Sequence, residues 1–275
     1  MPDNLVNLTS GFTAIAFDSR LYKLDRLPDP HLLSARLPRF REAYPSIPEA
    51  RWPECDLIGT FNPPMLDQLQ NGCVGHGGCT AFTLAWLASG QYPPDGGFSP
   101  TWVYALINGG RDQGASIGDL IDALTTVGLC SAKTFPEQKS MLGGAIEPTA
   151  RAEAANYQIE DAYQITSWAE KGTALAMGYP IADSVMVGND FANLDANGFV
   201  PVDRGSGNHC CCVGGIRRFN GKLGIKTQNS WGLSFGLNGM FYTNEQHVLS
   251  QGAGYSGVVF RTVKRLPGSA VPIIV

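Results

Sequence analysis

Residues Pro63–Trp86 read PPMLDQLQNGCVGHGGCTAFTLAW, and this stretch decides how the rest of the chain is interpreted. It joins a glutamine-rich lead-in to a run of helix-forming residues, with Cys73 and Cys79 near the glycine-rich junction. The free N–H groups and positive dipole end of a helix N-terminus favour thiolate over thiol. Since most cysteines are small buried hydrophobes, the stretch permits a nucleophile without requiring one.

The composition is that of a globular protein with a real core. The chain has 275 residues, 44% of them hydrophobic, which predicts one large domain or two lobes. The net charge of −4 comes with no basic patch, so we expect no nucleic-acid partner. There is no signal-peptide pattern and no apolar run long enough to span a membrane. We therefore expect a cytoplasmic protein with no membrane partner.

The cysteines indicate reduced thiols. They are Cys55, Cys73, Cys79, Cys130, Cys210, Cys211 and Cys212. An odd number that includes three adjacent residues is a poor disulfide framework. No CxxC or HxxxH spacing supports zinc, so we assign no metal and no cofactor. Because side chains alternate along a strand, Cys210 and Cys212 should point away from Cys211, and we interpret all three as packing residues.

Local signals divide the chain into a helical half and a β half. Ser99 followed by Pro100 predicts the start of one helix. Ser116 predicts the start of the next, which Gly128 ends. Beyond residue 156, short segments rich in β-branched and aromatic residues are separated by Gly, Asn and Asp, which is typical of strands. This order predicts a helical lobe followed by a β lobe, with a cleft between them.

These changes of composition and predicted secondary structure divide the chain into four segments. Residues 1–55 are Pro-rich and predict an extended arm, which either covers the cleft like a propeptide or makes an assembly contact. Residues 56–160 form the expected helical lobe and residues 161–265 the expected β lobe. Residues 266–275 form an apolar tail that could add as a strand to a partner's sheet. The tail predicts incorporation into a larger protein assembly, such as a viral particle.

Two later motifs supply a histidine and an asparagine on predicted strands. Gly207-Asn208-His209 precedes one strand, and NSWGLSFGLNG begins at Asn229. With these motifs the chain resembles the papain-like cysteine peptidases, particularly their bacterial and viral branch. Cys73 precedes His209 by 136 residues and Asn229 by 156, close to the family spacing of about 130–150. The resemblance implies an α+β, two-lobed papain-like fold, with a helical lobe and an antiparallel β-barrel-like lobe flanking the active site.

The resemblance also implies a function and a set of site residues. It implies a cysteine-type endopeptidase that cleaves peptides or proteins through a thioester acyl-enzyme, with Cys73 as nucleophile and His209 as base and acid. Asn229 matches the residue that orients the histidine, and Trp231 the aromatic side chain that shields this contact from water. Gln68 matches the glutamine whose amide, with the backbone N–H of the nucleophile, forms the oxyanion hole.

The choice of nucleophile stays open between two cysteines. Both NGCVGHG and GGCTAFT fit the motif, and Cys79 is the alternative to Cys73. Six residues of helix turn about 600°, so the two thiols point about 120° apart and only one can face His209. Spacing from Gln68 favours Cys73. Against it, three glycines would then lie in the first turns, each costing about 1 kcal/mol relative to alanine.

Other residues depart from the family pattern or carry no assigned role. Asn208 stands where a second glycine is common, and Phe235 where a tryptophan is common. We interpret His76 as a core histidine, and His31 and His247 as surface residues. Two other functions remain as hypotheses: a structural or virion-assembly component that uses this fold for docking, and an amidase or transpeptidase acting on peptide-like cell-wall bonds.

Overall fold

The computed structural model describes residues 37–68, 70–108, 110–137, 148–204 and 207–263. The helices in these ranges are α3 (Phe40–Ala43), η1 (Glu49–Arg51), α4 (Leu57–Phe61), α5 (Cys73–Ala88), α6 (Pro100–Ile107), α7 (Ile117–Thr126), α8 (Pro148–Ala154), α9 (Trp168–Ala176), α10 (Glu245–Gln251) and η2 (Gly252–Gly254). The strands are β1 (Cys55–Asp56), β2 (Ile159–Ile165), β3 (Ile181–Val185), β4 (His209–Phe219), β5 (Lys222–Gln228), β6 (Met240–Thr243) and β7 (Gly257–Val263).

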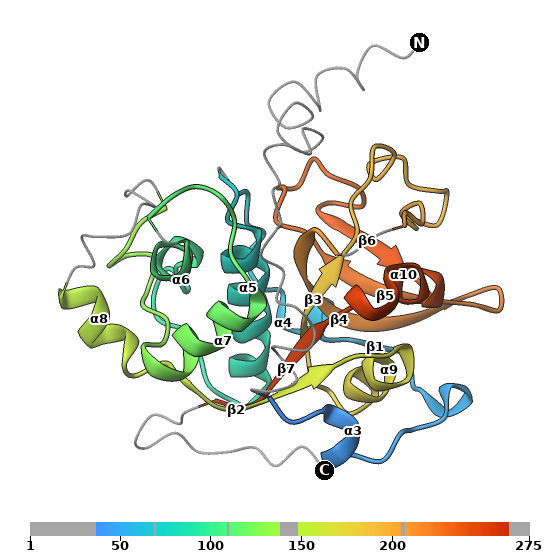
Figure 1. Ribbon diagram of the computed structural model, residues 1–275, viewed down its shortest axis with the longest axis horizontal. Coiled ribbons are helices and arrows are strands. Elements are labelled where there is room, and N and C mark those ends of the chain that lie inside the picture. The colour runs from blue at the N-terminus through green and yellow to red at the C-terminus, as the bar shows by residue number, and fades with distance from the viewer. Residues whose placement is uncertain (1–36, 69, 109, 138–147, 205–206, 264–275) are drawn as a thin grey trace, which may run out of the picture.

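The described strands form one antiparallel sheet in the order β2-β7-β3-β4-β5-β6, and β1 pairs with β4. The α+β class is confirmed, because the helices α5 to α8 lie on one side of the molecule and most of the sheet on the other (Figure 1). The described strands of the β-barrel-like lobe do not close into a complete barrel. Strands β2 and β6 stand at opposite ends of the order and do not pair, so the sheet stays open.

Helix α5 lies at the centre of the fold (Figure 1). It contacts α6 and α7 on one side and β4 on the other. Every residue from Cys73 to Trp86 is buried, as expected for a helix enclosed on all sides. The N-terminus of this helix is therefore held firmly by both halves of the protein.

The glycines of α5 allow this close packing. A Cβ atom at Gly75 would lie 2.6 Å from the carbonyl oxygen of Pro100 at the start of α6, and one at Gly77 would lie 2.7 Å from that of Cys210 in β4. A Cβ atom at Gly78 would overlap the side chain of Leu120 in α7. The propensity cost of these glycines is therefore offset by contacts that no larger residue could make.

The helix starts predicted by Ser99 and Ser116 are confirmed. Ser99 Oγ accepts a hydrogen bond from the backbone N–H of Trp102 at 3.1 Å, and Ser116 Oγ accepts one from that of Asp119 at 3.0 Å. Helices α9 and α10 were not predicted. The first begins with a similar cap, in which Ser167 Oγ accepts from the N–H of Glu170 at 3.2 Å.

The described part of the N-terminal arm packs on the β half. Phe40 and Trp52 are buried there in a cluster with apolar residues of β2, α9, β3 and β4. Trp52 lies directly against Gly172 of α9, where a Cβ atom would overlap its ring. Residues 1–36 and the expected tail at 266–275 lie outside the described residues. In the described part of the chain, no helix is long and apolar enough to cross a membrane.

Candidate active site

Strands β4 and β5 bring His209 and Asn229 together. His209 is the first residue of β4, and Asn229 directly follows β5. The two strands pair with Cys212 opposite Gln228, so continuing this register places Asn229 opposite Cys211. His209 Nε2 lies 2.8 Å from Asn229 Oδ1. Because the amide oxygen can only accept, Nε2 carries the hydrogen in this bond, and in the neutral ring Nδ1 is left as the basic nitrogen.

Trp231 covers the contact between His209 and Asn229. Its ring centroid lies 4.8 Å from that of His209. Phe191 and Phe235 pack against Trp231 with centroid distances of 5.7 and 5.0 Å. Phe235, which stands where a tryptophan is common, thus keeps an aromatic edge contact at this position. The aromatic cluster excludes water from the imidazole and amide.

Cys73 is the first residue of α5, with Gly72 at the N-cap. Its side chain is 3% exposed, and the backbone N–H of Cys210 donates to its sulfur. The thiol therefore lies beside the residue that follows His209. Burial raises the pKa of the Cys73 thiol to about 11, although backbone N–H groups of Cys210 and of the first turn of α5 act in the opposite direction.

Burial shifts the pKa of His209 in the opposite direction, downward. It lowers the pKa of His209 to about 4, while the hydrogen bond to Asn229 partly opposes the shift. Burial alone thus favours the uncharged pair at neutral pH, a thiol beside a neutral imidazole. Formation of the thiolate and imidazolium requires their mutual attraction, as in a buried ion pair.

Gln68 is joined to the Asn229 segment by Ser230. The backbone N–H of Gln68 donates to Ser230 O at 2.8 Å, and Ser230 Oγ donates to Gln68 Oε1 at 2.6 Å. Gln68 Nε2 donates to Gln70 O at 3.0 Å. The bond from Ser230 fixes which end of the Gln68 amide is the nitrogen. Sequence reasoning missed this role, because Ser230 lies 162 residues from its partner.

Cys79 lies six residues further along α5 than Cys73, and its side chain points about 120° away from that of Cys73. It is 2% exposed and belongs to the apolar cluster around α5, α6 and α7. Burial raises its pKa, and Thr83 one turn later opposes the shift through a hydrogen bond. The alternation expected for the cysteine run is confirmed, because Cys210 and Cys212 pack in the cluster with α5 while Cys211 packs in the cluster with Trp231. None of the seven cysteines forms a disulfide bond.

The remaining histidines differ from one another. The interpretation of His76 as a core residue is confirmed, since its side chain is fully buried. The expectation that His247 lies on the surface is wrong: it is 5% exposed, and Nε2 lies 3.1 Å from Val200 O and 3.2 Å from Pro201 O. The cause is α10, which buries one face against the loop before β4. His31 lies outside the described residues.

Asn208 has a structural role that the sequence did not reveal. Its Oδ1 accepts from the backbone N–H of Val187 at 2.6 Å, and its Nδ2 donates to Val187 O at 2.8 Å. These two bonds tie the chain just before His209 to the segment that follows β3. The asparagine, which stands where a glycine is common, therefore helps to hold the start of β4.

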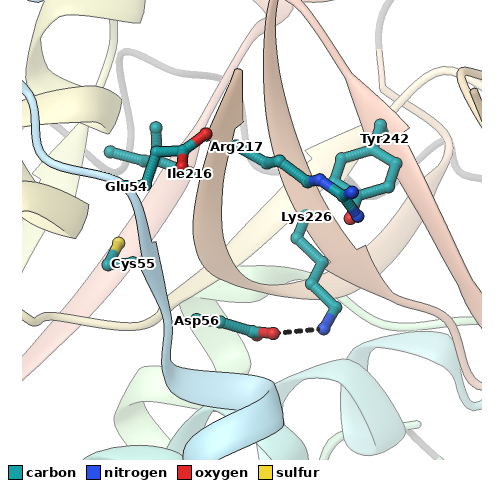
Figure 2. A pocket seen from close by; sticks show the side chains of 7 residues that line it. All are labelled: Glu54, Cys55, Asp56, Ile216, Arg217, Lys226 and Tyr242. Carbon is teal, nitrogen blue, oxygen red and sulfur yellow. Dashed lines mark hydrogen bonds and ion pairs between the residues drawn. The ribbon is translucent and has the colours of Figure 1, made fainter. Parts of the chain in front are cut away.

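A pocket of about 390 Å³ lies on another part of the sheet (Figure 2). Its lining contains none of the candidate catalytic residues and consists of Glu54, Cys55, Asp56, Ile216, Arg217, Lys226 and Tyr242. Lys226 Nζ is bound to Asp56 Oδ2 at 2.6 Å, so this cation already has a partner. In the described part of the chain, no three His, Cys, Asp or Glu side chains are grouped to hold a metal ion.

Comparison with known proteins identifies the fold. No protein-family model matches the sequence, and no curated protein matches it. Among solved structures, xylellain, a cysteine protease from Xylella fastidiosa, is 20% identical, with a TM-score of 0.68 over 83% of this chain and 92% of that one. Digestive procathepsin L 3 of Tenebrio molitor is 14% identical, with a TM-score of 0.64 over 84% of this chain and 74% of its own.

The bromelain protease of Ananas comosus, solved with the E64 inhibitor, is similar as well. It is 13% identical, with a TM-score of 0.62 over 74% of this chain and 96% of that one. These structures share the arrangement of a helical half packed against an antiparallel sheet. The chain has the fold of the papain-like cysteine proteases.

Proposed function

We propose that this protein is a cysteine peptidase that cleaves peptides or proteins through a thioester acyl-enzyme. One arrangement carries the proposal. His209 is bound to Asn229 at 2.8 Å, and the N–H of the next residue, Cys210, donates to the sulfur of Cys73 at the N-terminus of α5. Nucleophile, base and orienting amide are the groups that thiol-dependent acyl transfer needs. The shared fold with cysteine proteases supports the same reaction.

The reaction moves two protons through His209, one from the thiol of Cys73 to the leaving amine and one from water back to Cys73. Cys73 gives its proton to Nδ1 of His209, and its sulfur attacks the substrate carbonyl carbon. His209 then protonates the leaving amine as the C–N bond breaks, which leaves a thioester. A water molecule attacks the thioester while His209 accepts its proton. The C–S bond breaks, the carboxylic acid leaves, and His209 passes the proton that it took from water to Cys73.

The negative oxygen of the tetrahedral intermediate needs hydrogen-bond donors. In our proposal these are the backbone N–H of Cys73 and the side-chain amide of Gln68. The amide nitrogen has two hydrogens, and one is directed to Gln70 O. The other serves the oxyanion. Ser230 supports this role, because its hydroxyl occupies the amide oxygen of Gln68 and keeps the nitrogen end toward the substrate.

The pH dependence follows from the two pKa shifts. With the pKa of His209 at about 4 and that of Cys73 at about 11, the pair holds one proton between these values, wherever that proton resides. Below pH 4 both groups are protonated and no thiolate forms. Mutual attraction in the ion pair stabilises the singly protonated form and widens this window.

We therefore expect kcat/KM to keep its plateau through mildly acidic pH, to fall near pH 4, and to fall again only well above neutrality. Initial rates measured across the range in which the protein stays folded check this expectation. An acidic limb near the ordinary histidine value of about 6.5 would contradict it.

The function is tested by covalent labelling together with hydrolysis. An epoxide inhibitor of thiol proteases should label one cysteine, and peptide mapping should place the label on Cys73. The same preparation should hydrolyse fluorescently labelled casein, and prior labelling should abolish this activity. A cell-wall peptide tested beside casein separates a peptidase from an amidase. A folded protein that neither takes the label nor cleaves either substrate would overturn the proposal.

A further inference from the structure

His76 is buried beside the candidate nucleophile, and both of its ring nitrogens are bonded. It lies one turn after Cys73 in α5 and is 0% exposed. Nδ1 lies 2.8 Å from the carbonyl oxygen of Gly72, and Nε2 lies 2.8 Å from Glu137 Oε1. A carbonyl oxygen only accepts, so Nδ1 must carry a hydrogen and donate it to Gly72. With both nitrogens engaged, His76 cannot serve as a second base.

The acceptor of this bond belongs to the peptide that carries the N–H of Cys73. The carbonyl of Gly72 and the N–H of Cys73 form one planar trans unit, so fixing the direction of the oxygen fixes the opposite direction of the N–H. Gly72 O also accepts from the backbone N–H of His76 at 3.0 Å. Two donors on this oxygen polarise the peptide and strengthen its N–H as a donor.

The surroundings hold residue 72 in place. A Cβ atom at Gly72 would lie 3.2 Å from His76 Nδ1 and 3.2 Å from the ring of Tyr104. Tyr104 OH donates in turn to Asp112 Oδ1 at 2.7 Å, and this same oxygen accepts from the backbone N–H of Asn71 at 2.9 Å. The two residues before Cys73 are thus clamped between α6 and the imidazole.

Packing alone does not account for the pair of His76 and Glu137. Burying polar or ionic groups costs desolvation free energy that an apolar side chain of similar size would not incur. Its neighbours in the helix, such as Val74, Ala81 and Phe82, fill the same core with apolar groups. The feature that an apolar residue could not reproduce at this position is the N–H directed at Gly72 O.

We propose that His76, itself held by Glu137, is a positioning residue for peptide hydrolysis. Its bond to Gly72 O aims the backbone N–H of Cys73 at the oxyanion of the tetrahedral intermediate. The inference rests on the proposed function, since it concerns the same reaction. It predicts a loss confined to steps that develop negative charge on a carbonyl oxygen.

Two amide substitutions provide a matched test. In His76→Asn the side-chain nitrogen can occupy the place of Nδ1 and donate to Gly72 O, whereas in His76→Gln the amide lies near the place of Nε2 and toward Glu137. Both variants remove the ring and keep a polar side chain. We expect His76→Gln to lower kcat on a peptide substrate between about 10-fold and 100-fold, with KM little changed, and His76→Asn to recover most of the loss.

Alkylation of Cys73 by iodoacetamide serves as the internal control. Attack on a saturated carbon forms no oxyanion, so the alkylation rate of His76→Gln should equal that of the wild type while its kcat is lowered. Equal kcat in His76→Gln and wild type would overturn the inference and leave the proposed function intact. So would parallel losses of alkylation and turnover, which indicate general distortion. If the folded wild type neither hydrolyses peptides nor reacts at Cys73, the proposed function fails, and the inference fails with it.

Discussion

Replacing Cys73 with alanine is expected to abolish peptide hydrolysis, with a loss in kcat of about 10⁶, the scale seen when the nucleophile of a catalytic triad is removed. The reason is its place at the first position of α5, where the N–H of Cys210 reaches the sulfur. Cys79→Ala should retain turnover, because Cys79 lies six residues further along α5, where its thiol points about 120° away from that of Cys73. Casein hydrolysis by the two purified variants measures the difference.

The pair of variants is informative because the two cysteines are similar in burial. They are 3% and 2% exposed, so each substitution leaves a small cavity and should lower the free energy of unfolding by about 1 kcal/mol. Thermal unfolding of both proteins checks this. If activity survived in Cys73→Ala and vanished in a folded Cys79→Ala, the nucleophile would be Cys79.

The second large effect is expected for the histidine. His209→Ala should lower kcat about as much as loss of the nucleophile, because thiol and base act as a unit. Asn229→Ala should leave measurable turnover, since it removes the bond to Nε2 at 2.8 Å but keeps the base itself. Turnover of both variants on the same peptide, measured at saturating substrate, tests the order of the two effects.

An unfolding measurement is needed beside this comparison. Both residues are nearly fully buried, and Asn229 Oδ1 also accepts from the backbone N–H of Ser230 at 2.9 Å. His209→Ala therefore leaves the amide of Asn229 without its imidazole, and loss of folding must be excluded by circular dichroism. A folded His209→Ala protein with near wild-type turnover would contradict the assigned base.

Local signals predicted those parts of the fold that depend on neighbouring residues. The caps at Ser99 and Ser116 were readable because a hydroxyl placed just before an apolar helix satisfies N–H groups within three residues. The alternation of Cys210, Cys211 and Cys212 was readable because it follows from strand geometry alone. Features of this kind require no knowledge of distant contacts.

Features that depend on distant partners were not predictable. The glycines of α5 counted against Cys73 at the N-terminus of the helix, because propensity registers only their cost. Their benefit is the approach of Pro100, Cys210 and Leu120, which the sequence does not reveal. The burial of His247 was missed for the same reason, since its partners Val200 and Pro201 lie 47 and 46 residues away.

The candidate site divides in the same way. The family motifs indicated Gln68, Cys73, His209 and Asn229 as site residues, but they assigned no role to Ser230 or Glu137. A serine or a glutamate has many uses, and only its contact across the fold gives it a specific one. The sequence could not predict that the sheet is open, because closure depends on which strands pair in space. The position of each strand in the sequence does not determine this.

The position of β7 in the sheet affects how the chain can fold. This strand is the last in the described sequence, yet in the sheet it lies between β2 and β3. Most of the sequence of the β half separates those two strands from β7. Until it is synthesised, β2 and β3 each keep an unpaired edge, and such edges are prone to join other chains. The contacts that close the sheet are also long-range, which slows folding. During synthesis the helical half can collapse early, but the sheet that carries His209 can be completed only after residue 263 has left the ribosome.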